Sequence, residues 1–268
     1  MQMEYLFNDW AWIDKKIRGQ KKVVLLCDYD GTLTPIVDRP ELAVASKETI
    51  KCLRRIAGKN KVLLGIVSGR AMGDIKERLS ISGTIYAGNH GLEIEGPGLK
   101  FVHPLAEELN SILRLINQVL NKAMKDIKGV IVEDKGVTLS VHYRLVDEQT
   151  LPEVHRRFEN IVRLPRMMGK IKTTAGKKVH EVRPAIPWDK GKAVSLIVDK
   201  YVPQHRRKDM VSVYLGDDRT DEDAFKVVNH MGGISILVGK PEQETEAKYY
   251  LNSTQEVLTF LSELDKLL

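Results

Sequence analysis

Five short apolar segments recur along the chain, each followed by polar or glycine-rich residues. They cover residues 23–27, 62–67, 84–87, 211–215 and 234–238. Amphipathic segments with helical spacing lie between most of them, at residues 46–57, 71–79, 190–200 and 221–228. Ser46 and Thr220 are the residues expected to cap two of these helices. Apolar strands that alternate with helices are typical of a parallel sheet covered on both faces, so the pattern predicts an α/β core with a Rossmann-like parallel sheet.

The middle of the chain has a different pattern. A long helical segment follows Pro104 and continues to about Met124, and a second helix is expected over residues 148–162. Each is followed by a hairpin pattern, the first around Asp134–Gly136 and the second turning near Ala175–Gly176. Apolar and polar residues alternate in the first hairpin, which indicates antiparallel strands with one exposed face. The pattern therefore predicts an α+β cap domain inserted into the α/β core.

These patterns give the expected domain boundaries and the general class of protein. The core is predicted over residues 1–104 and 186–268, and the cap over residues 105–185. The chain has 268 residues, 43% of them hydrophobic and 29% charged, which is typical of a soluble globular protein. It has no apolar run near the roughly 20 residues that span a bilayer, and its first residues lack the features of a secretion signal.

Charge and cysteine content narrow the expected partners and compartment. The formal charge of +6 comes from scattered basic residues, without the aromatic-interleaved basic stripe of a nucleic-acid site. Only two cysteines occur, Cys27 in a predicted strand and Cys52 in a predicted helix, and both are expected to be buried apolar residues. We therefore expect a cytoplasmic monomer that binds neither nucleic acid nor membrane.

Candidate chemistry lies at the ends of the predicted core strands, where open parallel sheets bind their ligands. The residues that follow the strands are Asp28, Asp30 and Gly31; Ser68, Gly69 and Arg70; Asn89 and His90; and Asp217, Asp218 and Asp221. Taken singly, Asp28 and Asp30 could be a polar turn, and the acidic run from Asp217 a solvated helix start. Together, so many carboxylates at one edge require a cation or a shared proton. Oxygen ligands without a Cys/His cluster favour Mg²⁺ over Zn²⁺.

Four motifs at these positions resemble those of the haloacid dehalogenase superfamily of phosphatases. They are "DYDGT" from Asp28, Ser68, Lys190 in "WDKGKA", and "GDDRTDED" from Gly216. The resemblance implies that Asp28 attacks phosphorus and forms an aspartyl-phosphate, while Asp30 protonates the leaving oxygen and then activates water. It also implies phosphate binding by Thr32, Ser68 and Lys190. The implied Mg²⁺ ligands are Asp28, Asp30 through its backbone carbonyl, Asp217 and Asp218, and Asp221 is an outer or alternate ligand.

Longer strings resemble the trehalose-6-phosphate phosphatases within this superfamily. They include "NHGLEIEGPG", "VHYR", "KKVHEVRP" and "GDDRTDEDAF". The resemblance implies hydrolysis of trehalose 6-phosphate and a cap with polar groups for two glucose rings. The candidate sugar-binding residues are Arg70, Asn89, His90, Glu93, His142, Arg144, Lys177, Lys178 and Glu181. For Lys177, Lys178 and Glu181, exposed charge on a hairpin is the alternative interpretation.

Four other functions fit part of the pattern. A phosphatase of another sugar or glycoside phosphate, such as sucrose phosphate or a glycosylglycerate phosphate, would use the same catalytic residues. A phosphomutase would return the phosphoryl group to a sugar. A receiver-type signalling domain also gathers acidic residues and a lysine around magnesium, but it is about half this length and has no cap. A catalytically silent binding module would keep the fold without turnover.

Overall fold

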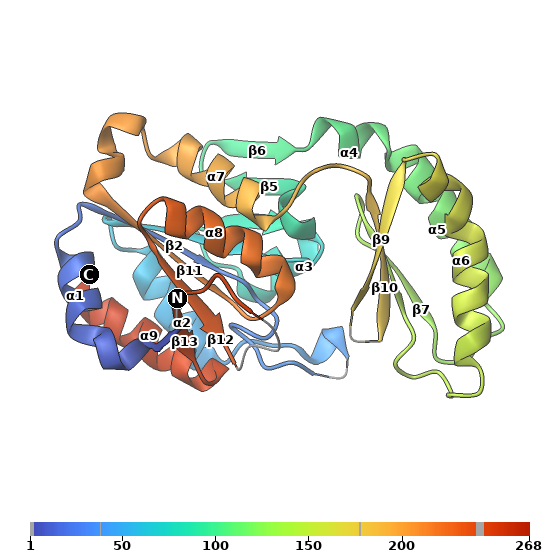
Figure 1. Ribbon diagram of the computed structural model, residues 1–268, viewed down its shortest axis with the longest axis horizontal. Helices are drawn as coiled ribbons and strands as arrows, with labels where there is room; N and C mark the ends of the chain where they lie inside the picture. The colour runs from blue at the N-terminus through green and yellow to red at the C-terminus, as the bar shows by residue number, and fades with distance from the viewer. Residues whose placement is uncertain (1–2, 38, 177, 240–243) are drawn as a thin grey trace. The chain divides into compact units, whose positions relative to one another are not determined.

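The apolar segments of the sequence form one sheet in the computed structural model, which describes residues 3–37, 39–176, 178–239 and 244–268 (Figure 1). Its strand order is β1-β13-β12-β11-β2-β3-β4-β5-β6. All pairs from β1 to β4 are parallel, and β5 is antiparallel to β4. The strands in this order are Glu4–Tyr5, Tyr249–Leu251, Ile234–Val238, Met210–Gly216, Lys22–Cys27, Val62–Val67, Ile85–Gly88, Glu93–Gly96 and Leu99–Val102.

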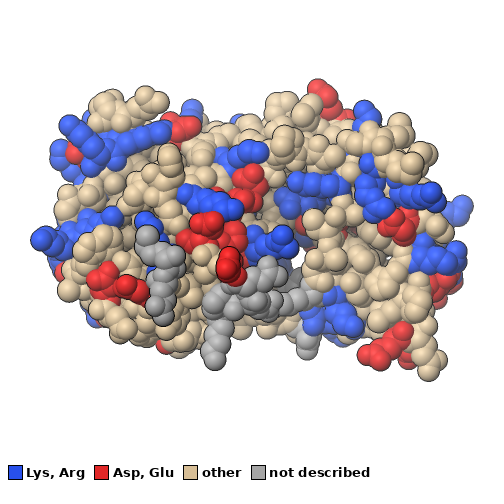
Figure 2. Space-filling view, in the orientation of Figure 1, with Lys and Arg blue, Asp and Glu red and all other residues tan. Residues whose placement is uncertain are grey.

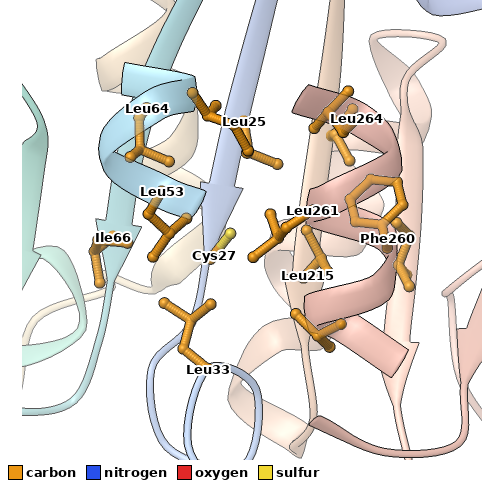
Figure 3. Packing of buried hydrophobic residues seen from close by; sticks show 14 of the residues in the cluster. Leu25, Cys27, Leu33, Leu53, Leu64, Ile66, Leu215, Phe260, Leu261 and Leu264 are labelled. Atoms are coloured by element: carbon orange, nitrogen blue, oxygen red, sulfur yellow. The ribbon is translucent and has the colours of Figure 1, made fainter. Parts of the chain in front are cut away.

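Helices cover both faces of this sheet, which explains why apolar and polar residues do not alternate along its strands. One face carries α1 (Trp10–Arg18), α2 (Lys47–Ala57), α3 (Met72–Leu79) and α9 (Thr254–Leu267), and the other carries α7 (Lys190–Tyr201) and α8 (Glu222–His230). Strand β2 sends Leu25 and Cys27 into the first layer and Val24 and Leu26 into the second. Figure 3 shows Leu25 and Cys27 between Leu53 of α2 and the leucines of α9. Asp28 and Asp30 therefore follow a central strand whose residues from Val23 to Cys27 are fully buried.

The chain divides into two compact units. The first, which we call the core unit, comprises Met1–Phe101 and Trp188–Leu268, and the second, the inserted unit, is Val102–Pro187. The inserted unit has an antiparallel sheet in the order β7-β8-β10-β9, formed by Ile131–Asp134, Leu139–His142, Val179–Pro184 and Ile171–Gly176. Its helices are α4 (Pro104–Glu108), α5 (Asn110–Met124) and α6 (Leu151–Met167). Helices α5 and α6 pack on one face of the sheet around Leu120, Val141 and Phe158.

The fold class predicted from the sequence is confirmed: a parallel α/β core with an inserted α+β unit. Several details differ. The helix expected from Pro104 to Met124 breaks at Leu109. Ser46 caps α2, accepting a 3.0 Å hydrogen bond from the Thr49 N–H, but Thr220 is not a cap. A short 3₁₀ turn precedes α8, and Asp218 caps that turn instead.

Three general expectations from composition can be compared with the structure. None of the helices in the described part of the chain combines the length and apolar character that a bilayer crossing needs. Figure 2 shows basic and acidic side chains interspersed over the visible face, in keeping with the scattered charges of the sequence. Cys27 and Cys52 are both buried and unpaired with each other, as expected of apolar packing residues.

Candidate active site

The loop after β2 places Asp28 and the residues that follow it in sequence at the edge of the core sheet. The Asp28 N–H donates to the Leu215 carbonyl at 2.8 Å, so the pairing with β11 continues to the aspartate itself. Gly31 has φ +77°, and a Cβ placed there would lie 2.0 Å from Asp217 Oδ2. The loops after β2 and β11 approach this closely because residue 31 has no side chain.

A buried ion cluster joins three elements of the core unit. Lys190, 2% exposed at the start of α7, places its Nζ 3.2 Å from Asp28 Oδ1 and 2.8 Å from Asp221 Oδ1. Asp221 Oδ1 also accepts a 2.7 Å hydrogen bond from the Tyr214 hydroxyl. Asp221 Oδ2 accepts from the backbone N–H groups of Asp217 and Asp218 at 3.0 and 3.2 Å. Asp221 thus fixes both the lysine and the loop that carries Asp217.

The electrostatics of this cluster fit a bound divalent cation. Burial and the neighbouring carboxylates raise the pKa of Asp28 well above its ordinary value, against the opposing effect of Lys190. The same causes raise the pKa of Asp217 to about 8. Within the described residues, Asp28, Asp217 and Asp221 each offer a ligand oxygen within 4.8 Å of the other two. A set of carboxylate oxygens whose charges repel one another is the environment that Mg²⁺ or another hard cation stabilises.

Hydrogen bonds already occupy both carboxylate oxygens of Asp221 and one oxygen of Asp218. Asp221 accepts four hydrogen bonds, so its role in this structure is to hold other groups. Asp218 Oδ1 accepts from the N–H and the hydroxyl of Thr220 at 2.8 and 2.7 Å. These contacts leave Asp28 and Asp217 as the carboxylates of the cluster most available to a cation.

The carboxylate of Asp30 forms an ion pair with Arg70, outside the cluster around Lys190. Arg70 donates to Asp30 Oδ2 and Oδ1 from Nε and Nη2, both at 2.7 Å. The Arg70 guanidinium also donates to Asp74 Oδ2 at 2.7 Å, and Asp74 Oδ1 accepts from Arg78 at 2.7 Å. Arg70 itself is 8% exposed, and its guanidinium lies 5.3 Å from the centre of the Tyr29 ring. Sequence reasoning missed Asp74, which lies in the first turn of α3, four residues after Arg70 in the loop before that helix.

The other predicted residues of the core unit lie on the adjoining loops. Thr32 Oγ1 donates to Asp217 Oδ1 at 3.5 Å, and Ser68 Oγ accepts from the Arg70 N–H at 3.2 Å. Asn89 and His90 are buried with φ values of 51° and 57°, in the short turn after β4. The Asn89 amide donates to Glu93 Oε2 at 2.6 Å, while burial raises the pKa of Glu93.

Two predicted residues of the inserted unit, His142 and Glu181, lie on the sheet face that α5 and α6 leave uncovered. Cross-strand pairing aligns Glu133, Ser140, Glu181 and Thr174 in one row of this face. Glu181 is an ion-pair partner of Lys135 at 3.8 Å and of Arg183 at 3.9 Å. Glu181 also has cross-strand neighbours on β8 and β9. An exposed charge on a hairpin is therefore an incomplete description of this residue.

The remaining predicted residues of this unit are placed less closely together. His142 Nε2 lies 2.8 Å from Glu133 Oε2, and Arg144 follows β8, half-buried. Lys178 is exposed with φ 65°, and Lys177 lies outside the described residues. Sequence reasoning missed Glu133 and Lys135. The available signal was their place beside the first hairpin turn, since the alternation of apolar and polar residues begins only at Val137.

Comparisons with known proteins agree with this geometry. The family model described as Trehalose-phosphatase matches residues 26–255. Trehalose 6-phosphate phosphatase RA3 from Zea mays is 39% identical over 258 residues, which cover 91% of this chain and 70% of that protein. A solved trehalose-6-phosphate phosphatase C-terminal domain from C. albicans superposes with a TM-score of 0.82 at 24% identity, covering 100% of this chain and 99% of that chain. A solved trehalose-6-phosphate phosphatase from Aspergillus fumigatus gives a TM-score of 0.65 at 27% identity, covering 99% of each chain. The chain therefore belongs to the trehalose-phosphatase family and is a phosphoric monoester hydrolase.

Proposed function

We propose that this chain hydrolyses trehalose 6-phosphate to trehalose and inorganic phosphate with Mg²⁺ as cofactor, through an aspartyl-phosphate intermediate. The observation that carries the proposal is the buried cluster in which Lys190 contacts Asp28 at 3.2 Å beside Asp217 and Asp221. A lysine and several carboxylates buried together at the end of a central strand are costly for stability alone, so a functional role explains them best.

Asp28 is the proposed nucleophile and Asp30 the proposed acid and base. A carboxylate oxygen of Asp28 attacks phosphorus while the bond to the sugar oxygen breaks, and Asp30 gives that oxygen its proton. Asp30 then takes a proton from the water that attacks the phosphoryl group on Asp28, which releases phosphate and regenerates the carboxylate. Thr32, Ser68 and Lys190 bind the phosphoryl oxygens, where their donors offset the charge of the transferring group.

The carboxylates of Asp28 and Asp217, with the backbone carbonyl of Asp30, are the proposed Mg²⁺ ligands. Asp218 completes the proposed set, and Asp221 orients it through the hydrogen bonds to the two backbone N–H groups. When bound, Mg²⁺ supplies positive charge that keeps Asp28 ionised and stabilises the phosphoryl oxygens. This arrangement explains why carboxyl groups with raised pKa values would serve as nucleophile and ligand.

Arg70 gives Asp30 a defined position before the reaction. Its two 2.7 Å hydrogen bonds occupy both oxygens of Asp30. Proton donation to the substrate therefore requires at least one of these bonds to be exchanged. We propose that substrate binding competes for the Arg70 guanidinium, so that Asp30 is released to act as the acid only when a sugar phosphate is present.

The sugar specificity is assigned to the inserted unit and to the turn after β4. The core over residues 1–104 and 186–268 would carry the chemistry, and residues 105–185 would act as the cap. Asn89, His90 and Glu93 would bind sugar hydroxyls from the core, and His142, Arg144, Lys177, Lys178 and Glu181 from the cap. Glu133 and Lys135 are added because they adjoin Glu181 and His142. We further propose that the protein works as a cytoplasmic monomer.

Phosphate release from a panel of phosphorylated sugars, with Mg²⁺ or with EDTA, tests the proposal. We expect trehalose 6-phosphate to be the best substrate, with turnover only in Mg²⁺. Asp28→Asn should lower kcat by at least about 10³-fold, whereas Asp223→Asn, an exposed change of the same charge on α8, should have no effect. Preferred hydrolysis of sucrose phosphate or another glycoside phosphate would refute the substrate, and sugar isomerisation without free phosphate would indicate a mutase.

A further inference from the structure

Two histidines of the inserted unit meet on the side of its sheet that faces the helices. His155 Nδ1 of α6 lies 2.8 Å from His180 Nε2 of β10. His180 shares a sheet face with Val182, which is buried in the core of this unit, and it pairs across the sheet with Val141 of the same core. Glu181 lies on the opposite face because side chains alternate along a strand. The histidine pair is therefore separate from the proposed sugar-binding row.

Aromatic neighbours hold both imidazole rings. Phe158 stacks on His180 with ring centres 4.5 Å apart and an angle of 14°. The Tyr143 ring packs against His155 at 5.0 Å and against His180 at 4.8 Å. A cavity of about 360 Å³ opens beside the pair, lined also by Glu159 and by Thr173 and Thr174 of β9. The two nitrogens thus converge in a fixed geometry next to open space.

The 2.8 Å separation limits the protonation of the pair. One ring nitrogen must donate and the other must accept, so at least one of the two imidazoles is neutral. Burial, and then the neighbouring His155, lower the pKa of His180, which favours the neutral form on the strand. The lone pair of one imidazole and the exchangeable N–H of the other are directed at the same point between them.

We propose that His155 and His180 bind Zn²⁺ at this point, with Glu159 as a third ligand and water completing the tetrahedron. Zn–N bonds of about 2.0–2.1 Å in a tetrahedron place two nitrogens about 3.4 Å apart, so the nitrogens have to separate by about 0.6 Å and the rings have to turn until both lone pairs meet at the ion. Glu159 is four residues after His155 and so lies on the same face of α6. Its carboxylate is now paired with Arg166 on the surface and has to turn from it to reach the ion.

The chemistry of this site differs from that of the acidic cluster. Imidazole nitrogens favour Zn²⁺ and similar transition metals, whereas carboxylate and carbonyl oxygens favour Mg²⁺. The His155–His180 site should therefore take up Zn²⁺ even when Mg²⁺ is in large excess. A bound ion would link α6 to β10. The inference does not rest on the proposed function, since it concerns different residues and a different ion.

Zn²⁺ titration of the full chain in excess Mg²⁺, followed by calorimetry, tests this inference. We expect one equivalent to bind, and Co²⁺ in its place to give the visible absorption of a tetrahedral complex. His155→Asn and His180→Asn should each weaken binding by at least tenfold, and Glu159→Gln by less. His205→Asn, an exposed histidine of the core unit, is the matched control and should bind like the unaltered chain.

Two results would overturn the inference. One is the absence of Zn²⁺ binding to the unaltered chain in excess Mg²⁺. The other is undiminished binding in both His155→Asn and His180→Asn. Circular dichroism of the metal-free variants establishes that each is folded, and the Zn²⁺-dependent rise in Tm gives a second readout that should disappear with either histidine. If one variant fails to fold, the other and Glu159→Gln still decide the question.

Discussion

Replacing Asp221 by asparagine tests whether this carboxylate anchors Lys190 in the buried cluster. The side chain is fully buried and accepts hydrogen bonds from Lys190, Tyr214 and two backbone N–H groups. The amide has nearly the same shape but only one accepting oxygen. If that oxygen keeps the two backbone donors, the amide NH₂ faces Tyr214, whose hydroxyl can rotate to accept, and Lys190, which cannot. The substitution therefore removes one partner of a buried ion pair.

The structure sets the expected size of this effect. Removing one partner of a buried pair costs about 3–5 kcal/mol, and the lower end applies because Lys190 keeps Asp28 at 3.2 Å. About 3 kcal/mol corresponds to a fall in Tm of roughly 6–12 °C for a domain of this size. Tyr214→Phe removes a single donor to the same oxygen and should cost about 1–2 kcal/mol. Asp223→Asn, an exposed change of equal charge, should stay within about 0.5 kcal/mol.

Urea denaturation of the metal-free protein, followed by tryptophan fluorescence, is the appropriate assay. All three tryptophans, Trp10, Trp12 and Trp188, belong to the core unit, so the signal reports the unit that contains Asp221. The expected order of destabilisation is Asp221→Asn, then Tyr214→Phe, then Asp223→Asn. If Asp221→Asn were no more destabilising than Tyr214→Phe, the ion pair with Lys190 would contribute little, and the argument for Asp221 as its anchor would fail.

Three further predictions concern the same edge of the sheet. Gly31→Ala should lower kcat/KM at least tenfold because the added Cβ would displace Asp217. Gly83→Ala is the control: residue 83 has φ +76° and open space around it, so the change should cost only about 1–2 kcal/mol of stability and leave activity intact. Retained activity in Gly31→Ala would contradict the close approach of residue 31 to Asp217. In EDTA, the stability of the fold should fall as pH rises from about 4 to 8. Burial and neighbouring carboxylates raise the folded-state pKa of Asp28, and they raise that of Asp217 to about 8, so the folded protein keeps protons that the unfolded chain has lost. Melting curves across this range should show the fall, and Mg²⁺ should reverse it. Asp74→Ala should lower kcat/KM about 10- to 100-fold because Arg70 loses the ion pair that holds it in position. Asp14→Ala, which breaks an exposed ion pair with Arg18, is the control and should leave the kinetics unchanged. Equal kinetics in the two variants would exclude a positioning role for Asp74.

Local sequence patterns predict the parts of this protein that depend on local interactions. The strands at residues 62–67 and 234–238 have the predicted bounds, because an apolar run with turn residues at both ends defines a buried parallel strand. Ser46 is a predictable cap since its hydroxyl bonds the N–H three residues on. Strands β5 and β6 were not predicted. Each has only four residues, most of them half-buried, at the end of the sheet order, where the hydrophobic signal is weak.

The capping of the turn before α8 shows where sequence reasoning loses resolution. Thr220 and Asp218 are both good capping residues within three positions. The choice falls on Asp218 because the side chain of Asp221 must reach back to the N–H groups of residues 217 and 218, which requires an extra 3₁₀ turn before the helix. That requirement comes from the buried position of Asp221 beside Tyr214 and Lys190, which are distant in sequence.

The division of labour among the acidic residues depends on such long-range contacts. Spacing alone makes Asp217, Asp218 and Asp221 equivalent candidates, yet Asp221 is saturated with hydrogen bonds and Asp218 is partly engaged with Thr220. Asp30 likewise follows Asp28, the proposed nucleophile, by two residues, but its carboxylate is held by Arg70 in the loop after β3, and Arg70 is held in turn by Asp74. The acid and base of a reaction must exchange protons on demand, so the residue that holds it at rest affects its role as much as its own position does. In the proposed mechanism, therefore, the partner of Arg70 at each stage of turnover, rather than the presence of Asp30 in the motif, would determine whether proton transfer keeps pace with phosphoryl transfer.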